Sequence, residues 1–290
     1  FTIDLDRMDG VADAVLAVTR KAYPTLDVPF HARWRHFVLG GADRWARLAD
    51  AASWPGRAAR ARAEFDLAIV SVLLDAGAGA AWRYRDAVTG ESIGRSEGLA
   101  IASLDMFASG LFSRDARAPF RVDADVLAQL PLASLTSAFQ VSDANPLLGL
   151  DGRTDLLRRL GKQVADRAEV FGLHDTPRPG GLFDHIAAQA VGGAIAAPAI
   201  LSAVLNQLGP IWPSRLALAK IPLGDCWRHP AIKADDATAG LVPLHTLSQW
   251  LSYSLIEPLQ RAGLEVTDIA GRTGLAEYRN VGQFLDHEVL

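Results

Sequence analysis

The sequence has a single cysteine, and this scarcity limits the covalent and metal chemistry open to it. Among 290 residues only Cys226 carries a thiol, so no disulfide can form within the chain. A chain without an internal disulfide is compatible with a reducing compartment, and we expect a cytoplasmic protein. A His-Glu-x-x-His motif, which places two zinc-binding imidazoles on one helix face, is also missing from the sequence.

Long apolar runs and an excess of basic residues are missing as well. Runs such as LAIVSVLL, residues 67–74, are far too short to cross a bilayer. The net charge is −4, whereas a general nucleic-acid binder presents a basic face. With 50% hydrophobic and 21% charged residues, the composition is that of a globular protein. We therefore expect neither a nucleic-acid partner nor a membrane partner.

Alternating patterns typical of strands are scarce, whereas helical periodicity recurs along the chain. Residues 82–96 are typical of a short hairpin that turns near Thr89 and Gly90. Apolar residues at helical spacing predict helices over residues 61–77, 151–167, 195–209 and 245–263. The first of these is apolar nearly all round, which predicts a buried central helix. We therefore predict a single all-α domain spanning residues 1–290, with at most a small β hairpin.

The stretch 245–263 is the clearest amphipathic helix of the sequence. One side carries Leu247, Trp250, Leu251, Leu255 and Leu259, and the other carries His245, Gln249, Ser252, Tyr253 and Glu257. Pro258 has no N–H, so it should kink this helix and release the carbonyl of Ser254. Proline and glycine cluster at 176–181 and 209–230, which predicts long ordered loops there.

The stretch LGDCWRHP, residues 223–230, holds the only cysteine beside an acid, a cation, an imidazole and an indole. One interpretation is a zinc site of Cys226 and His229, completed by His31, His36, His245 or an acid. A second is a thiol nucleophile with His229 as its base. A third is the wall of a pocket that holds a polar substrate.

Similar mixtures of charge and aromatic residues recur at 30–37, 80–86 and 273–280. Buried arginines and acids are costly unless they are paired, so these segments suit a structural polar network. The alternative is that several of them meet at one cleft for a small, hydroxyl-rich ligand. We predict that the segments 223–230, 245–253 and 273–280 converge on such a cleft.

Long segments that occur in order along the chain carry a family resemblance. They include FHARWRHF, FQVSDANPLLGLDGR, GPIWPSRL, PLGDCWRHP and LVPLHTLSQWLSYSLIEPLQRAG. Together they resemble a uracil-catabolism family, that of the fourth protein of the URC pathway, called urg three in another naming and formerly a domain of unknown function. The resemblance runs from about residue 3 to residue 290, and family members look longer at both ends. It implies a role in a pathway that opens the uracil ring through a ribosylurea intermediate.

A more distant resemblance links three segments to the queuosine salvage proteins. NPLLGLDGRTDLLRRLG, LHTLSQWLSYSL and GLAEYRN look like motifs of those N-glycosidases, whose all-α fold is similar to helix-hairpin-helix DNA glycosylases. Gln249 matches the salvage family's glutamine, and residues 277–279 (Glu-Tyr-Arg) match its Asp-Tyr-Arg. Ser254 stands where that family has an aspartate, which leaves Glu277 and Asp225 as the candidate carboxylates.

These resemblances imply an N-glycosidase that hydrolyses a ribosylurea-type substrate with or without a 5′-phosphate. We expect a hydrolase with a small-molecule substrate, no cofactor and no metal. Its transition state resembles an oxocarbenium ion, which a carboxylate stabilises and a proton donor to the leaving urea assists. The expected catalytic residues are Glu277, Asp225 and His229. The expected substrate-binding residues are Trp227, Arg228, His245, Gln249, Tyr278, Arg279, Asn280, Asp143 and Asn145. Two alternatives stay open: a zinc or thiol amidohydrolase that cleaves the ureido group, and a non-catalytic ligand-binding or partner protein of the pathway.

Overall fold

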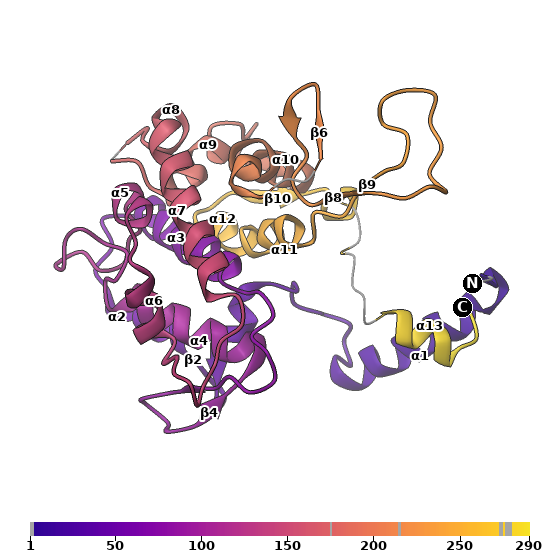
Figure 1. Ribbon diagram of the computed structural model, residues 1–290, viewed down its shortest axis with the longest axis horizontal. Helices are drawn as coiled ribbons and strands as arrows, with labels where there is room; N and C mark the ends of the chain where they lie inside the picture. The colour runs from indigo at the N-terminus through magenta and orange to yellow at the C-terminus, as the bar shows by residue number, and fades with distance from the viewer. Residues whose placement is uncertain (1–2, 175, 214–215, 273–274, 276–279) are drawn as a thin grey trace. The chain divides into compact units, whose positions relative to one another are not determined.

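The computed structural model describes residues 3–174, 176–213, 216–272, 275 and 280–290. By its internal contacts the chain divides into two compact units, one formed by residues 1–30 with 274–290 and the other by residues 31–273. Figure 1 shows the elements of both units. The predicted boundary of one domain over the whole chain stays a prediction.

The smaller unit joins the two ends of the chain. It holds the 3-10 turn η1 (Leu5–Arg7), helix α1 (Met8–Ala22) and helix α13 (Asn280–Asp286). The backbone N–H of Asp4 donates to the carbonyl of Val289 over 2.9 Å, and the Arg7 guanidinium pairs with the carboxylate of Glu288. These contacts tie the N-terminal segment to the C-terminal one.

The larger unit is built around helix α3 (Arg57–Leu73), in which every side chain from Ala63 to Leu73 is buried. This confirms the buried central helix that the sequence predicts. The other helices of the unit are α2 (Arg44–Ala51), α4 (Arg95–Ala108), α5 (Ala124–Ala128), α6 (Leu132–Ala138), α7 (Leu150–Asp166), α8 (Ala168–Phe171), α9 (Leu182–Ala187), α10 (Ala197–Leu208), α11 (Thr246–Ser254) and α12 (Ile256–Arg261). Short 3-10 segments are η2 (Arg33–Phe37), η3 (Pro179–Gly181), η4 (Gly209–Ile211) and η5 (Ile269–Gly271).

Arg33 is a buried charge of the larger unit that is paired, as the structural interpretation of the mixed segments requires. The Arg33 side chain is fully buried and donates to Ser71 Oγ and to Asp75 Oδ2, each over 2.6 Å. Asp75 also accepts a hydrogen bond from Ser96 Oγ. Arg33 therefore links η2 to Ser71 on α3 and, through Asp75, to Ser96 on α4. A buried ion pair is stable only when both partners are satisfied in this way.

The prediction of an all-α fold is wrong, although about 52% of the chain is helical. The described residues of the larger unit form five two-stranded sheets. Four are antiparallel pairs: β1 (Val38–Leu39) with β2 (Ala42–Asp43), β3 (Tyr84–Arg85) with β4 (Ser92–Ile93), β6 (Ala217–Leu218) with β7 (Ile221–Pro222), and β8 (Cys226–Arg228) with β9 (Leu241–Pro243). The fifth pairs β5 (Ala194–Ala196) with β10 (Glu265–Thr267) in parallel. Strands of two or three residues are too short to show the alternation from which strands are predicted.

The expected hairpin within 82–96 is confirmed by the β3–β4 pair. Its turn is closed by Asp86, whose carboxylate accepts hydrogen bonds from Thr89 N and Thr89 Oγ1. Gly90 adopts a φ of +75°, which a residue without Cβ adopts at little cost. By contrast, the region 209–230, expected to be loop, includes η4, β6, β7 and β8.

The helix is interrupted at Leu255, near the expected kink at Pro258. Helix α11 ends at Ser254 and α12 begins at Ile256. The carbonyl of Ser254, which Pro258 cannot satisfy, accepts a hydrogen bond of 2.7 Å from Trp34 Nε1, so the predicted release of this carbonyl is confirmed. The side of the helix expected to be polar is partly buried, because Gln249 and Ser252 are only 6% and 0% exposed.

Within the described ranges, no helix is both long and apolar enough to span a membrane.

Candidate functional site

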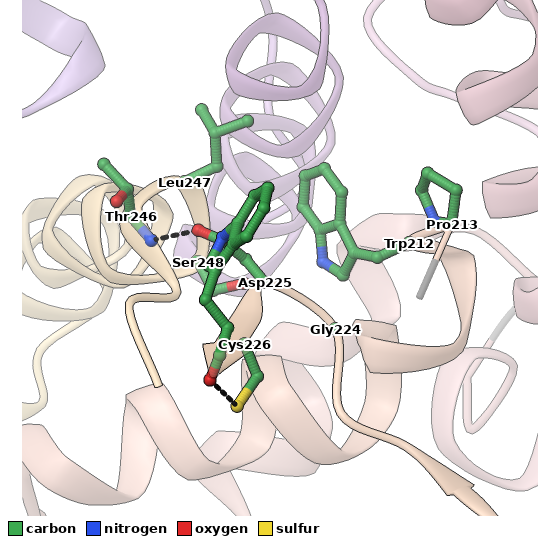
Figure 2. A pocket seen from close by; sticks show the side chains of 9 residues that line it. Trp212, Pro213, Gly224, Asp225, Cys226, Thr246, Leu247 and Ser248 are labelled. Carbon is green, nitrogen blue, oxygen red and sulfur yellow. Dashed lines mark hydrogen bonds between the residues drawn. The ribbon is translucent and has the colours of Figure 1, made fainter. Parts of the chain in front are cut away.

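A cavity of about 560 Å³ lies where the segment 224–227 meets the start of α11. Figure 2 shows side chains from three separate segments around it. The lining residues are Trp212, Pro213, Gly224, Asp225, Cys226, Trp227, Thr246, Leu247 and Ser248. Two of the three segments predicted to converge, 223–230 and 245–253, therefore meet at one cavity.

The β8–β9 pair brings Asp225 to the beginning of α11. Because Cys226 pairs with Pro243, the chain after β9 passes directly beside Asp225. The Asp225 carbonyl accepts hydrogen bonds from Leu244 N over 3.1 Å and from His245 N over 3.0 Å. His245 has a left-handed φ of +46°, and α11 begins at the next residue.

The Asp225 carboxylate is held at both of its oxygens. Oδ1 accepts from Trp227 Nε1 over 3.0 Å, and Oδ2 accepts from the backbone N–H of Thr246 over 3.1 Å. Thr246 is the first residue of α11, where a negative charge is favoured by the helix dipole. The cavity wall thus carries an oriented carboxylate, which can stabilise a developing positive charge or accept a proton from water.

The His245 imidazole lies beside this acid. A Cβ built on Gly224 would be 3.8 Å from its ring. Burial lowers the pKa of His245, and the charge of Asp225 opposes this shift only in part. The neutral form of the ring is therefore favoured.

Arg228 and His229 lie further along the β8–β9 hairpin and do not line this cavity. They line a separate groove of about 410 Å³ with Lys233 and neighbouring residues. The Arg228 guanidinium donates to the Ala239 carbonyl over 2.5 Å, and His229 Nδ1 accepts from Ala231 N over 3.2 Å. Both side chains are exposed. The expected catalytic residue His229 and the expected substrate-binding residue Arg228 therefore do not share this cavity with Asp225.

Gln249 does not line the cavity. Its side-chain Nε2 donates to the Leu244 carbonyl over 2.9 Å, and its Oε1 is buried without a hydrogen-bond partner in the described part of the chain. Ser254, the position of the missing salvage-family aspartate, is fully buried and supports the core. Its Oγ accepts from Arg33 N over 2.9 Å and donates to the Trp250 carbonyl over 3.0 Å.

Asp143 and Asn145 lie away from the cavity. Asn145 ties its loop to the β3–β4 hairpin, because its Oδ1 accepts from Arg83 N and its Nδ2 donates to the Arg83 carbonyl. Asp143 is exposed. Neither residue belongs to the lining of the cavity.

The expected residues Glu277, Tyr278 and Arg279 lie outside the described residues. Asn280 is described as the first residue of α13, in the smaller unit. The predicted convergence of the segment 273–280 with the other two stays a prediction.

Cys226 lines the cavity and is 7% exposed. Its Sγ lies 3.9 Å from the Trp227 carbonyl. His229, the other half of the possible zinc pair, belongs to the separate groove. Among the residues that the structure describes, no three His, Cys, Asp or Glu side chains are grouped to hold a metal ion.

Sequence reasoning missed Trp212, which lines the cavity and also an adjoining cavity of about 430 Å³. The two cavities share Trp212, Pro213 and Leu247, and the second extends to Gly149 and Arg153 at the start of α7. The side chain of Arg153 is fixed there, with Nε donating to the Leu74 carbonyl over 2.9 Å. A tryptophan inside the Gly/Pro-rich segment GPIWPSRL was the available sequence feature, because loops with aromatic residues often line binding sites.

Comparison with known proteins shows what this chain is similar to. A family model described as "Protein of unknown function (DUF1688)" matches residues 1–290. The chain is 36% identical over 308 residues to "Uracil catabolism protein 4" of Lachancea kluyveri, covering 100% of this chain and 69% of the relative. It is 36% identical over 305 residues to "Protein urg3" of Schizosaccharomyces pombe, covering 100% of this chain and 70% of the relative.

Proposed function

The chain belongs to the DUF1688 family, and from that premise we propose that it acts in uracil catabolism as an N-glycosidase. The substrate is a ribosylurea-type compound, with or without a 5′-phosphate. The name of the relative from Lachancea kluyveri supports the pathway. The reaction itself is supported by the site.

The observation that carries the proposal is the position of Asp225. Its carboxylate lines a cavity of about 560 Å³, is oriented by two hydrogen bonds, and shares the wall with the indoles of Trp212 and Trp227. Flat aromatic rings suit a planar ureido group and the apolar face of a sugar. A fixed carboxylate beside such a cavity is what an oxocarbenium-like transition state requires.

The reaction is a hydrolysis in which the C1′–N bond breaks and a C1′–O bond forms. The electron pair of the C1′–N bond leaves with the urea nitrogen, which takes up a proton. Water supplies the new oxygen at C1′, and Asp225 accepts the proton that this water loses. The products are urea and ribose, or ribose 5-phosphate when the substrate carries a phosphate.

Two further candidates for the chemistry stay within this proposal. Glu277 is the carboxylate that matches the salvage-family motif, and His229 is the expected donor to the leaving nitrogen. His229 does not line the cavity, and Glu277 lies outside the described residues, so Asp225 is the first residue to test. His245 beside Asp225 is the neutral partner that can relay or accept a proton.

A second candidate function is favoured by the exposure of Cys226 to the same cavity. In a thiol amidohydrolase the Cys226 sulfur would attack the ureido carbonyl and displace ammonia, and water would then hydrolyse the acyl-enzyme to carbon dioxide and ribosylamine. This activity needs a base next to the sulfur, and the described residues place no imidazole in hydrogen-bond contact with Cys226 Sγ.

Product analysis tests these functions directly. The protein is incubated with ribosylurea and, separately, with its 5′-phosphate, and the products are identified by mass spectrometry. Free urea together with ribose or ribose 5-phosphate supports the N-glycosidase. Release of ammonia and carbon dioxide would replace it with the amidohydrolase, and no turnover of either compound would contradict both.

A further inference from the structure

Arg272 is a buried arginine whose charge faces no carboxylate in the described part of the chain. It is 9% exposed, and its Cζ lies 3.4 Å from the centroid of the Tyr253 ring on α11. One nitrogen, Nη1, donates to Ser252 Oγ over 2.9 Å. The other two nitrogens, Nε and Nη2, are buried and have no hydrogen-bond partner among the described residues.

The other buried arginines have more acceptors, although Arg33 Nη2 is also buried without a hydrogen-bond partner among the described residues. Arg33 pairs with Asp75, and Arg178 pairs with Asp66. Arg153 donates to the backbone carbonyls of four residues: Leu74, Ala76, Gly77 and Leu148. A buried guanidinium without acceptors is costly, so a position that serves only the fold would supply them.

The two free nitrogens of Arg272 form one edge of the guanidinium. The N–H bonds of Nε and Nη2 point the same way and match the two oxygens of a carboxylate or phosphate. The opposite edge is anchored by Ser252, whose Oγ in turn donates to the Gln249 carbonyl over 2.7 Å. The free edge is therefore held in a fixed orientation, which is what bidentate recognition of an anion needs.

A chain of hydrogen bonds connects Arg272 with the cavity. Asp225 O accepts from Leu244 N, and Leu244 O accepts from Gln249 Nε2. Gln249 O accepts from Ser252 Oγ, and this hydroxyl accepts from Arg272 Nη1. Gln249 also contributes a free acceptor, because its Oε1 is buried without a partner among the described residues. The anion-binding edge is thus linked to the backbone carbonyl of Asp225 by one network around the start of α11.

We infer that Arg272 is a substrate-binding residue that holds an oxyanion, a carboxylate or a phosphate, through Nε and Nη2. That the anion is part of the substrate rests on the proposed function, whereas the anion site itself rests on Arg272. The inference selects the phosphorylated substrate, or one with a carboxylate, over the neutral riboside.

Calorimetric titration tests the site without requiring turnover. The probes are ribose 5-phosphate, ribonate and ribose, which differ in carrying a phosphate, a carboxylate or no charge. We expect at least one anionic probe to bind roughly tenfold or more tightly than ribose, because a bidentate charged contact exceeds a neutral one. The anion that binds more tightly identifies the source of the charge.

Three variants assign the preference to Arg272. Arg272→Met should abolish the preference for the anion, and Arg272→Lys should keep only part of it, because lysine offers charge without the fork. Arg117→Met is the matched control, since Arg117 is 91% exposed and pairs with Asp115. Its affinities should equal those of the wild type.

Equal affinities for all three probes in the wild type would overturn the inference, as would an unchanged preference in Arg272→Met. The melting temperature without probe gives a second readout. A ligand-binding role predicts that Arg272→Met melts at or above the wild-type temperature, since an unpaired buried charge is removed. Earlier melting together with no anion preference in the wild type would show a structural role. If anion binding holds but neither ribosylurea compound releases urea, the N-glycosidase fails and the anion site stands.

Discussion

At the scale of single residues, Asp225 has two roles. Its backbone carbonyl and its carboxylate together accept hydrogen bonds from Leu244, His245 and Thr246, so it fixes the beginning of α11. The same carboxylate lines the cavity beside Trp227. The effect of a substitution at this residue must therefore be measured on both stability and turnover.

The substitution Asp225→Asn should separate these two roles. Asparagine keeps the shape and an oxygen acceptor, but removes the charge that stabilises the transition state. We expect turnover to fall by roughly 10²–10⁴-fold with little change in substrate binding, because the charge acts mainly in the transition state. Urea release and the melting temperature are measured on one preparation. Asp235→Asn, an exposed aspartate on the same hairpin, is the control, and near-native turnover of Asp225→Asn would remove this residue from the mechanism.

Cys226 should be dispensable for the chemistry although it lines the cavity. Cys226→Ser keeps the size of the side chain and removes the thiol. If the sulfur is neither nucleophile nor ligand, kcat should stay within about threefold of wild type, well short of the loss expected for a catalytic group. A modest fall in melting temperature is expected, because a buried hydroxyl is less favourable than a thiol unless it finds a partner. Loss of all turnover in a folded Cys226→Ser protein would favour the amidohydrolase instead.

At the scale of elements, the larger unit depends on close approach between its 3-10 turns and its central helix. Gly180 in η3 donates its N–H to Asp66 Oδ1 on α3. A Cβ on Gly180 would clash with the Arg62 carbonyl and would lie 2.8 Å from Asp66 Oδ1. The absence of a side chain allows Asp66, buried in the core, to be satisfied by both Gly180 and Arg178.

The substitution Gly180→Ala should therefore destabilise the fold. The added methyl group clashes with helix backbone that cannot easily move, and we expect a loss of about 1–3 kcal/mol in the free energy of unfolding. Gly209→Ala is the matched control, because a Cβ added to Gly209 would meet no atom within 4 Å among the described residues and its φ is −48°. Urea denaturation of both variants measures the difference, and equal stability of the two would contradict the close packing of η3 on α3.

At the scale of the whole molecule, the stability of the fold should depend on pH through buried histidine. Burial, and then the charge of Arg33, lower the pKa of His36, whereas Asp75 and Glu97 oppose the shift. The unfolded chain then takes up a proton at a higher pH than the folded protein. Stability is therefore complete above the unfolded pKa of about 6.5 and is lost as the pH falls through this value toward the folded pKa.

We expect the free energy of unfolding to decrease between about pH 7 and pH 5. His36→Gln should show a smaller decrease over this window, while part remains because the pKa of His245 is also lowered by burial. His229→Gln, at an exposed position, should follow the wild type. Urea denaturation at pH 7, 6 and 5 provides the comparison. A slope that is identical in His36→Gln and wild type would show that His36 does not contribute.

Local sequence patterns determined the helical character of the protein and several of its details. The apolar stretch around Phe65 became the buried helix α3, and Pro258 released the Ser254 carbonyl as predicted. The hairpin at Thr89 and Gly90 formed where the turn residues indicated. These features depend on backbone geometry and on hydrophobic periodicity over a few neighbouring residues, so the sequence alone carries them.

Only the tertiary structure decided the sheets and the composition of the site. The parallel pairing of Val266 with Ile195 joins strands far apart in the chain, and three residues in a strand leave no readable pattern. The cavity likewise depends on Trp212, Asp225 and Thr246 meeting from three segments. The two unpaired nitrogens of Arg272 depend on which acceptors the fold places within hydrogen-bond distance. Sequence composition could nominate Asp225, but the choice of partners for a buried charge is made by long-range packing, and local sequence does not encode it.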